Sequence, residues 1–148
     1  MKWLRRFFAL RSADQGLQLL AGLLLVTIKL GLRWLPFPAV LRVLYRLKKT
    51  RIGSYPSRSY SRFRVIQAVE VVSRHIPGGS SCLVRALAVQ VLLGQQGRQT
   101  QLQIGVALVA DGQFVAHAWV EDDGRILAGN REDLDLYTVL RPITENRT

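Results

Sequence analysis

The spacing of apolar residues changes once along the chain, and this change constrains the fold more than any other feature. Up to about residue 93, apolar side chains recur at helical intervals, as Val65, Val69 and Val72 do. From residue 101 to residue 130 they alternate with small or polar residues, which is typical of strands. A block of helices followed by a block of strands predicts an α+β fold.

Four helices are expected before the change. The first begins at a candidate N-cap, Asp14, and ends near Trp34, because Pro36 interrupts the pattern soon after. The other three are expected at about 38–48, 61–75 and 82–93. The last of them is apolar almost all round, so we expect it to be the central buried helix, packed on the sheet.

Turn signals at Asp111-Gly112 and Asp123-Gly124 divide residues 101–130 into an antiparallel three-strand meander, and residues 137–140 are expected to add a short strand. If both turns have two residues, His117 faces Val106 and lies on the sheet face that the central helix covers. The same arithmetic across the second turn places Asn130 opposite His117.

The positive charge of the chain is concentrated in its first part. Residues 1–64 contain fourteen Lys or Arg and a single acid, Asp14, whereas residues 65–148 carry a small net negative charge. Such a segment suits anionic lipid or an acidic protein or peptide. Nucleic acid is not expected as a partner, because the sequence contains no helix-turn-helix pattern and no paired aromatic residues on a strand.

The N-terminal part also contains the most apolar stretch. Gln15 to Ile28 is uncharged but is only 14 residues long, short of the roughly 20 that a membrane span needs. We therefore expect a buried helix, or one that lies on a partner or on a membrane surface. The expected organisation is a basic, apolar helical segment at 1–50, a loop at 51–58 and a catalytic domain at 59–148.

Cys82 is the only cysteine, and it follows Ser80-Ser81 at the expected start of the central helix. A thiol in this position meets backbone N–H groups and the positive end of the helix dipole, which stabilise a thiolate. One cysteine forms no internal disulfide, which fits a reducing cytoplasm. One Cys and two His make a zinc site implausible, so no metal is expected.

His117, in Ala116-His117-Ala118-Trp119, is the expected base for Cys82, since a cysteine nucleophile needs a nearby proton acceptor. His75 is the rival base, although its place at a helix end suits a capping role. Asn130 is nominated to orient His117, with Asp133 and Asp135 as charged alternatives. Trp119 is expected to pack the core or the wall of the site, and Glu121 to lie near its rim.

Two segments carry a family resemblance. Ser81-Cys82-Leu83-Val84-Arg85-Ala86-Leu87-Ala88, followed by Ala116-His117-Ala118-Trp119-Val120-Glu121 and Gly124-Arg125, resembles the lasso-peptide maturation proteases. Among these, it is most similar to the stand-alone leader peptidases whose leader-binding module is a separate protein. The resemblance covers residues 60–141 closely, and His-Ala-Trp alone is typical of the wider transglutaminase-like superfamily.

The resemblance implies a transglutaminase-like or papain-like cysteine protease that removes the leader from a ribosomally made precursor, so that a cyclase can close the freed core peptide. Cys82 would be the nucleophile and His117 the base. Some relatives carry the orienting acid where this chain has Gly129, so Asn130 or Asp133 must serve here, or the acid is absent.

The implied partners are the precursor leader, a leader-binding protein and the cyclase, with residues 1–50 docking one of the proteins or the membrane surface. No cofactor is expected in this chain. It lacks a Gly-rich phosphate loop, so any ATP is assigned to the cyclase. Another transglutaminase-like acyl transferase or amidase, or a non-catalytic peptide-binding relative, remains the alternative. The backbone N–H of Cys82 is the expected oxyanion donor.

Overall fold

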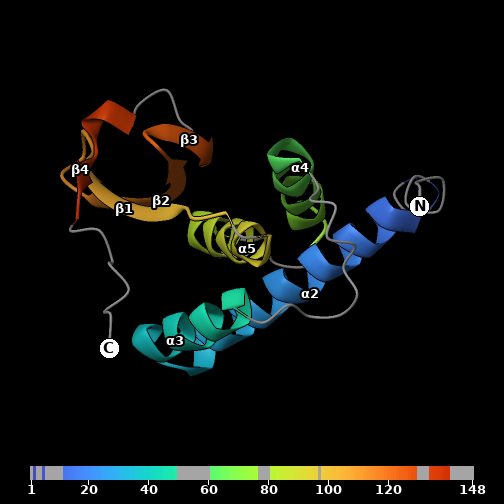
Figure 1. Cartoon of the computed structure of the whole chain (residues 1–148). Coiled ribbons are helices and arrows are strands. Elements are labelled where there is room, and N and C mark those ends of the chain that lie inside the picture. Colours follow the sequence, from blue (N-terminus) through green and yellow to red (C-terminus); the bar gives the residue numbers. More distant parts are fainter. Residues whose placement is uncertain are drawn as a thin grey trace.

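The computed structural model describes residues 2, 5, 12–49, 61–76, 81–96, 98–129 and 134–140. Helices precede strands, so the α+β prediction is confirmed (Figure 1). The helices are α2 (Ser12–Trp34), α3 (Phe37–Lys49), α4 (Arg62–Ser73) and α5 (Cys82–Gln95). The strands are β1 (Gln101–Leu108), β2 (Phe114–Asp122), β3 (Arg125–Ala128) and β4 (Thr138–Val139), with a 3-10 turn η1 (Leu134–Leu136) before β4. The predicted loop at 51–58 lies outside the described residues.

Serine caps fix where α4 and α5 begin. The hydroxyl oxygen of Ser61 accepts a hydrogen bond from the backbone N–H of Arg64. Ser81 does the same for Val84, across 3.2 Å, and so sets Cys82 as the first residue of α5. By contrast, α2 begins two residues before Asp14, so the prediction that Asp14 caps this helix is wrong.

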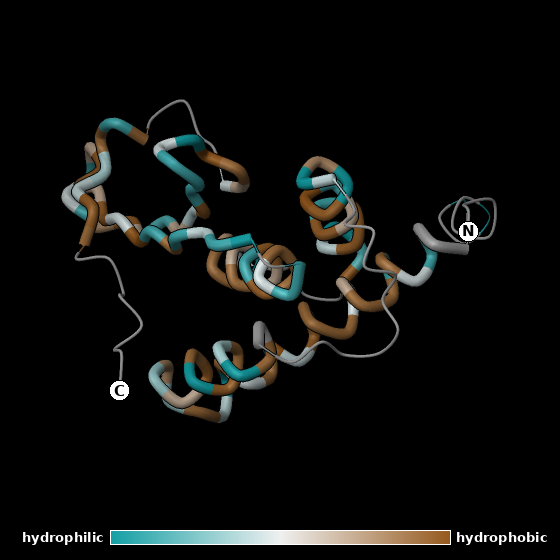
Figure 2. Tube along the Cα trace, viewed as in Figure 1, coloured by the Kyte–Doolittle hydropathy of each residue, from teal (hydrophilic) through white to brown (hydrophobic). Residues whose placement is uncertain are grey.

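Helix α5 lies at the centre of the molecule, as predicted, with the sheet on one side and the other helices on the other (Figures 1 and 2). Its side chains Leu87 and Leu93 are fully buried. Leu25 and Ile28 of α2 belong to the same hydrophobic core, and so does Val120 of β2. The basic N-terminal helices therefore share one core with the elements that carry Cys82 and His117.

The sheet has the strand order β3-β2-β1-β4, and all its neighbouring strands are antiparallel. The predicted meander and the short fourth strand are both confirmed. The first turn, however, has three residues rather than two. The N–H of Gly112 donates to the Val109 carbonyl, and Gly112 has a φ of 84°. This is a type I turn closed by a residue in the left-handed region.

The extra turn residue shifts the register by one. His117 pairs with Gly105 and not with Val106. Because alternate residues of a strand point to opposite faces, the prediction that His117 lies on the face covered by α5 is wrong. That face carries Ala118 and Val120 of β2, whereas His117 shares the opposite face with Trp119.

The second turn has two residues, as predicted, and both Asp123 and Gly124 have positive φ. A bulge follows it, because Glu121 pairs with Ile126 but Val120 pairs with Ala128. The bulge changes the register before His117 is reached. The arithmetic that placed Asn130 opposite His117 is therefore wrong, and Asn130 itself lies outside the described residues.

Candidate active site

Cys82 is a partly exposed free thiol at the first position of α5. The first N–H groups of a helix have no acceptor inside it. The Ser81 hydroxyl takes the N–H of Val84, so the N–H groups of Cys82 and Leu83 are the ones without an acceptor within α5. The thiol thus lies at the positive end of the helix, as the sequence predicted.

His117 is held in one orientation by a backbone acceptor. It is 7% exposed, and its Nε2 lies 2.6 Å from the carbonyl oxygen of Gly129. A carbonyl oxygen only accepts hydrogen bonds, so Nε2 carries the hydrogen. In the neutral ring the lone pair is then on Nδ1, which is the nitrogen able to accept a proton.

Trp119 and Tyr137 form an aromatic platform that packs against the imidazole of His117. The Trp119 indole stacks on it with ring centroids 6.0 Å apart and planes at 20°, and the Tyr137 ring lies 5.8 Å away. Trp119 is fixed in turn, because its Nε1–H donates to Oε1 of Glu121 across 2.7 Å. Trp119 therefore packs against the base, and Glu121 pairs with this indole.

Gly105 makes room for this platform. It lies directly opposite His117 in the sheet, and a Cβ built on it would come within 2.9 Å of the Trp119 indole and 3.0 Å of Tyr137. Any side chain here would push the indole away from the imidazole. An isolated glycine inside a strand signals such a close approach, and this signal was present in the sequence.

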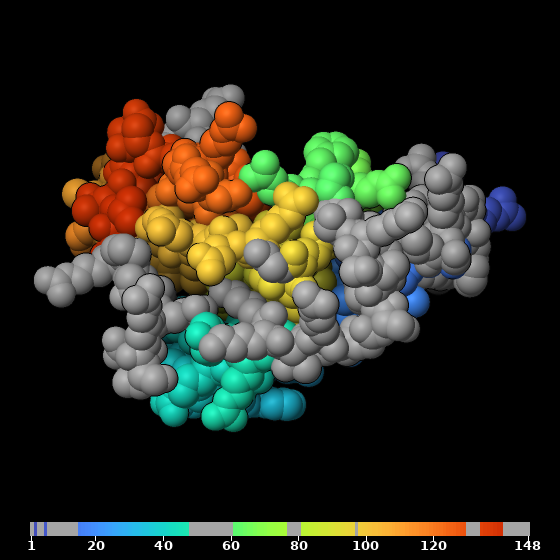
Figure 3. All heavy atoms as spheres, in the orientation of Figure 1, coloured from blue at the N-terminus to red at the C-terminus, as the bar shows by residue number. Residues whose placement is uncertain are grey.

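Cys82 and His117 line one pocket of about 540 Å³. Its wall is completed by residues of α4, α5, β2 and β3 and by the residue after β3, namely Ile66, Glu70, Arg85, Ala116, Leu127, Ala128 and Gly129. On the face shown in Figure 3, β3 and α4 lie side by side above α5. None of the described hydrogen bonds joins the thiol to the imidazole, a bond that often forms only when substrate is present.

The short third strand ends before it reaches His117, and the residue after it, Gly129, holds the imidazole at the pocket. β3 pairs with β2 only from Val120 to Asp122. Beyond this ladder Gly129 packs against β2, since a Cβ built on it would lie 2.7 Å from the carbonyl oxygen of Ala118. Ala116, next to His117 in β2, and Gly129, whose carbonyl holds the His117 ring, both line the pocket.

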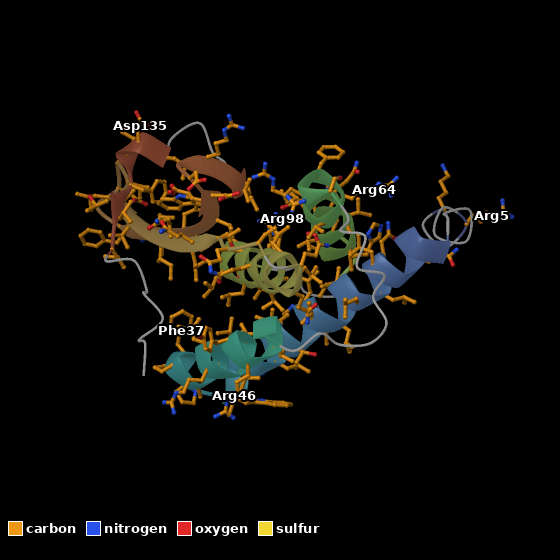
Figure 4. The ribbon with its side chains drawn as sticks, in the orientation of Figure 1. Arg5, Phe37, Arg46, Arg64, Arg98 and Asp135 are labelled. Atoms are coloured by element: carbon orange, nitrogen blue, oxygen red, sulfur yellow. The ribbon has the colours of Figure 1, made fainter. Side chains whose placement is uncertain are left out.

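Gly129 has no side chain for a physical reason. Its φ is 83°, and an added Cβ would lie 2.7 Å from the carbonyl oxygen of Ala118. An acid at this position does not fit this backbone. Asp133, like Asn130, lies outside the described residues, and Asp135 is exposed on η1 (Figure 4). The described partner of the His117 ring is the Gly129 carbonyl.

The remaining candidates lie elsewhere. His75 is exposed and uses its Nδ1–H on the carbonyl oxygen of Val71, one turn earlier, and it does not line the pocket. This contact fits the capping role. In the described ranges, no cluster of three or more His, Cys, Asp or Glu side chains is placed to hold a metal ion.

The sequence reasoning missed an ion pair in the pocket wall. Nη1 of Arg85 lies 3.2 Å from Oε2 of Glu70 and links α5 to α4 beside the thiol. Nε of Arg85 is buried and has no hydrogen-bond partner among the described residues. The sequence does place Arg85 on the helix face of Cys82, because Arg85 follows Cys82 by three residues, but it does not indicate the pairing with Glu70.

Comparison with known proteins adds one finding. A family model described as the transglutaminase-like superfamily matches residues 22–142, a range that begins within α2 and includes Cys82 and His117. No curated protein and no solved structure matches the chain. The family match covers most of the chain and agrees with the observed arrangement of a cysteine-bearing helix on an antiparallel sheet. The chain belongs to the transglutaminase-like superfamily.

Proposed function

We propose that this protein is a cysteine peptidase that removes the leader from a lasso-peptide precursor. The superfamily includes cysteine peptidases and acyl transferases, so membership supports thiol-based acyl chemistry in general. The observation that carries the proposal is the shared pocket. A thiol at the start of α5 and an imidazole with a fixed tautomer lie in its wall together.

The first half of the reaction forms an acyl-enzyme. Nδ1 of His117 accepts the proton of the Cys82 thiol, and the sulfur attacks the carbonyl carbon at the leader–core junction. The tetrahedral intermediate then collapses with cleavage of the C–N bond. The core amine leaves with the proton from Nδ1, and the leader stays bound to Cys82 as a thioester.

The second half releases the leader. Nδ1 takes a proton from water as the water oxygen attacks the thioester carbon, and the C–S bond breaks to give the leader carboxylate. The proton returns to the sulfur. The backbone N–H groups of Cys82 and Leu83, which have no acceptor within α5, are the proposed donors to the oxyanion in both halves.

The lasso-peptide assignment rests on the sequence around the two residues. Ser81-Cys82-Leu83-Val84-Arg85 and Ala116-His117-Ala118-Trp119 both resemble the stand-alone leader peptidases. The proposed partners are therefore the precursor leader, a separate leader-binding protein and a cyclase, which is also the proposed user of any ATP. The proposed compartment is the cytoplasm, where the single thiol stays reduced.

An acyl transferase or amidase is the alternative with the same nucleophile. The product masses separate the three. A peptidase cuts the precursor into two fragments that together gain one water, a transferase joins the acyl group to another acceptor, and an amidase leaves the main chain whole. The test is to incubate the full chain with a precursor peptide and the leader-binding protein, and to measure all products by mass spectrometry.

Cys82→Ala decides whether the chain is catalytic. We expect this variant to bind the precursor and to unfold at the same temperature as the parent, while cleavage falls at least about a thousandfold. Cleavage by Cys82→Ala at the parent rate would rule out the thiol mechanism. A parent protein that binds the leader but gives no product with its partners present would instead indicate a peptide-binding relative.

A further inference from the structure

Helix α2 carries an apolar stripe on the side that faces away from the core. Its residues follow at intervals of four or three, so they form one line along the helix. They are Leu19, Leu23, Val26, Leu30 and Trp34. Leu17, Ala21, Leu25 and Ile28, on the opposite side of the helix, are fully buried. The helix is therefore apolar on two faces. One face is buried in the core of the protein, and the other is exposed.

The stripe is far more exposed than a core helix requires. Leu23 is 65% exposed and Trp34 is 74% exposed. Single exposed apolar residues are common on protein surfaces, but a continuous row of them marks a contact surface. Figure 2 shows hydrophobic residues along most of α2 beyond its polar N-terminal end. We therefore expect a lipid bilayer or another protein surface to cover this row of side chains.

The positive charge around the stripe favours binding to an anionic surface. α2 and α3 together contain six Lys or Arg and one acid, Asp14. Arg33 beside the stripe and Arg42 on α3 are exposed, and Arg46 lies on the outer side of α3 in Figure 4. Cations beside an apolar row, with an exposed tryptophan at its end, are the pattern of helices that lie at a bilayer surface.

A membrane-spanning arrangement does not fit the packing. The segment Gln15–Trp34 is long and apolar enough to cross a bilayer, and it is longer than the uncharged stretch from Gln15 to Ile28. Leaving the core, however, would expose Leu25 and Ile28 and the side chains of α4 and α5 that cover them. Only the outer face of α2 is available while the domain stays folded.

A bilayer fits the stripe better than a protein partner does. The residues of the stripe have no polar group that would fix a partner's position, apart from the indole N–H at its end. The hydroxyl of Thr27, which lies beside the stripe, already donates to the carbonyl oxygen of Leu23 across 2.7 Å. Lipid chains need no such groups, because apolar burial and charge attraction are sufficient.

We propose that the outer stripe of α2 rests on an anionic bilayer surface, with Arg33 of α2 and Arg42 of α3 at the lipid phosphates. The helix lies parallel to the membrane plane and holds the folded domain at the surface. This inference does not depend on the peptidase proposal, because it rests on exposure and charge away from the Cys82 pocket.

The test is co-sedimentation of the full chain with vesicles of phosphatidylcholine, with and without phosphatidylglycerol. We expect binding to the anionic vesicles that weakens as salt is raised. Leu23→Gln should reduce the partition coefficient about tenfold. Leu136→Gln is the matched control, since Leu136 is 70% exposed on η1, away from α2, and should bind as the parent does.

Charge reversal gives a second, independent pair. Arg33→Glu should also weaken binding about tenfold, whereas Arg125→Glu, exposed on β3, should not. Thermal unfolding of each variant shows whether the fold is intact. No binding by the parent, or equal losses in Leu23→Gln and Leu136→Gln, would overturn the proposal. So would self-association of the parent that Leu23→Gln abolishes, because the occupant would then be a second copy.

Discussion

The imidazole of His117 is oriented by the backbone carbonyl of Gly129, to which its Nε2–H donates across 2.6 Å. In a cysteine–histidine pair the third group fixes the tautomer and aims the other ring nitrogen. Here a peptide oxygen, the carbonyl of Gly129, does this. A carbonyl has no proton to gain, so the orienting bond does not depend on the ionisation of a third side chain.

We predict that Gly129→Ala damages both stability and activity. The added Cβ would lie 2.7 Å from the Ala118 carbonyl oxygen. The alanine residue would also have to adopt a φ of 83°, which residues with a side chain rarely do. The expected loss of unfolding free energy is about 2–4 kcal/mol. The displaced carbonyl should lower kcat more than it raises KM, and steady-state kinetics with denaturant unfolding measure both effects.

Gly112→Ala is the matched control for Gly129→Ala. Gly112 has nearly the same φ, 84°, but a Cβ there has nothing within 4 Å. Its cost should be limited to backbone strain of about 1 kcal/mol, with kcat unchanged. Equal losses of kcat in the two variants would show that the Gly129 carbonyl has no special role.

His117→Ala should lower kcat by about a thousandfold, because the base that activates the thiol is lost. His75→Ala should leave kcat within about twofold of the parent value, since His75 bonds the Val71 carbonyl and lies outside the pocket wall. Single-turnover cleavage of the precursor is the measurement. A larger effect from His75→Ala than from His117→Ala would reverse the assignment of the base.

Gly105→Ala tests the aromatic platform. The new methyl group would lie 2.9 Å from the Trp119 indole, which must move and lose its stacking on His117. We expect a loss of about 1–3 kcal/mol in stability, a lower kcat and a changed near-ultraviolet circular dichroism spectrum. Parent-like kcat together with a changed spectrum would show that the stacking does not position the base.

Arg85→Met tests the pocket wall. The guanidinium lines the pocket and pairs with Glu70 at 3.2 Å, so its loss should weaken precursor binding without touching the reacting atoms. KM should rise about tenfold, with kcat within about twofold. Arg62→Met is the control, because Arg62 pairs with Asp122 at 2.7 Å outside the pocket. An unchanged KM in Arg85→Met would exclude this wall from substrate contact.

Most of the architecture could be predicted from periodicity and turn residues. The helices at 61–75 and 82–93 and the meander are present because serine caps, prolines and Asp-Gly turns act locally. The sheet register could not be predicted. Asp111-Gly112 is compatible with a two-residue or a three-residue turn, and one residue decides which face His117 occupies. The bulge at Val120 leaves no signal in the apolar pattern.

The position of the candidate nucleophile was easier to predict than the group that orients the candidate base. Cys82 lies at the start of its helix because Ser81 caps it, which is a local effect that the sequence contains. The Gly129 carbonyl is a backbone group, and every residue has one, so the sequence does not indicate which carbonyl accepts the hydrogen bond. The Glu70–Arg85 pair depends on how α4 packs on α5, which one sequence does not reveal.

The two apolar faces of α2 have a practical consequence for anyone preparing this protein. Truncation of the apolar, basic N-terminal helices would be an obvious way to try to raise the yield of soluble protein. Here that deletion would remove Leu25 and Ile28, which fill the core beside α5. The shortened chain would trade an exposed apolar row for an exposed core and would aggregate. Polar replacement at Leu19, Leu23 and Leu30 would improve solubility and leave the core beside the Cys82 pocket intact.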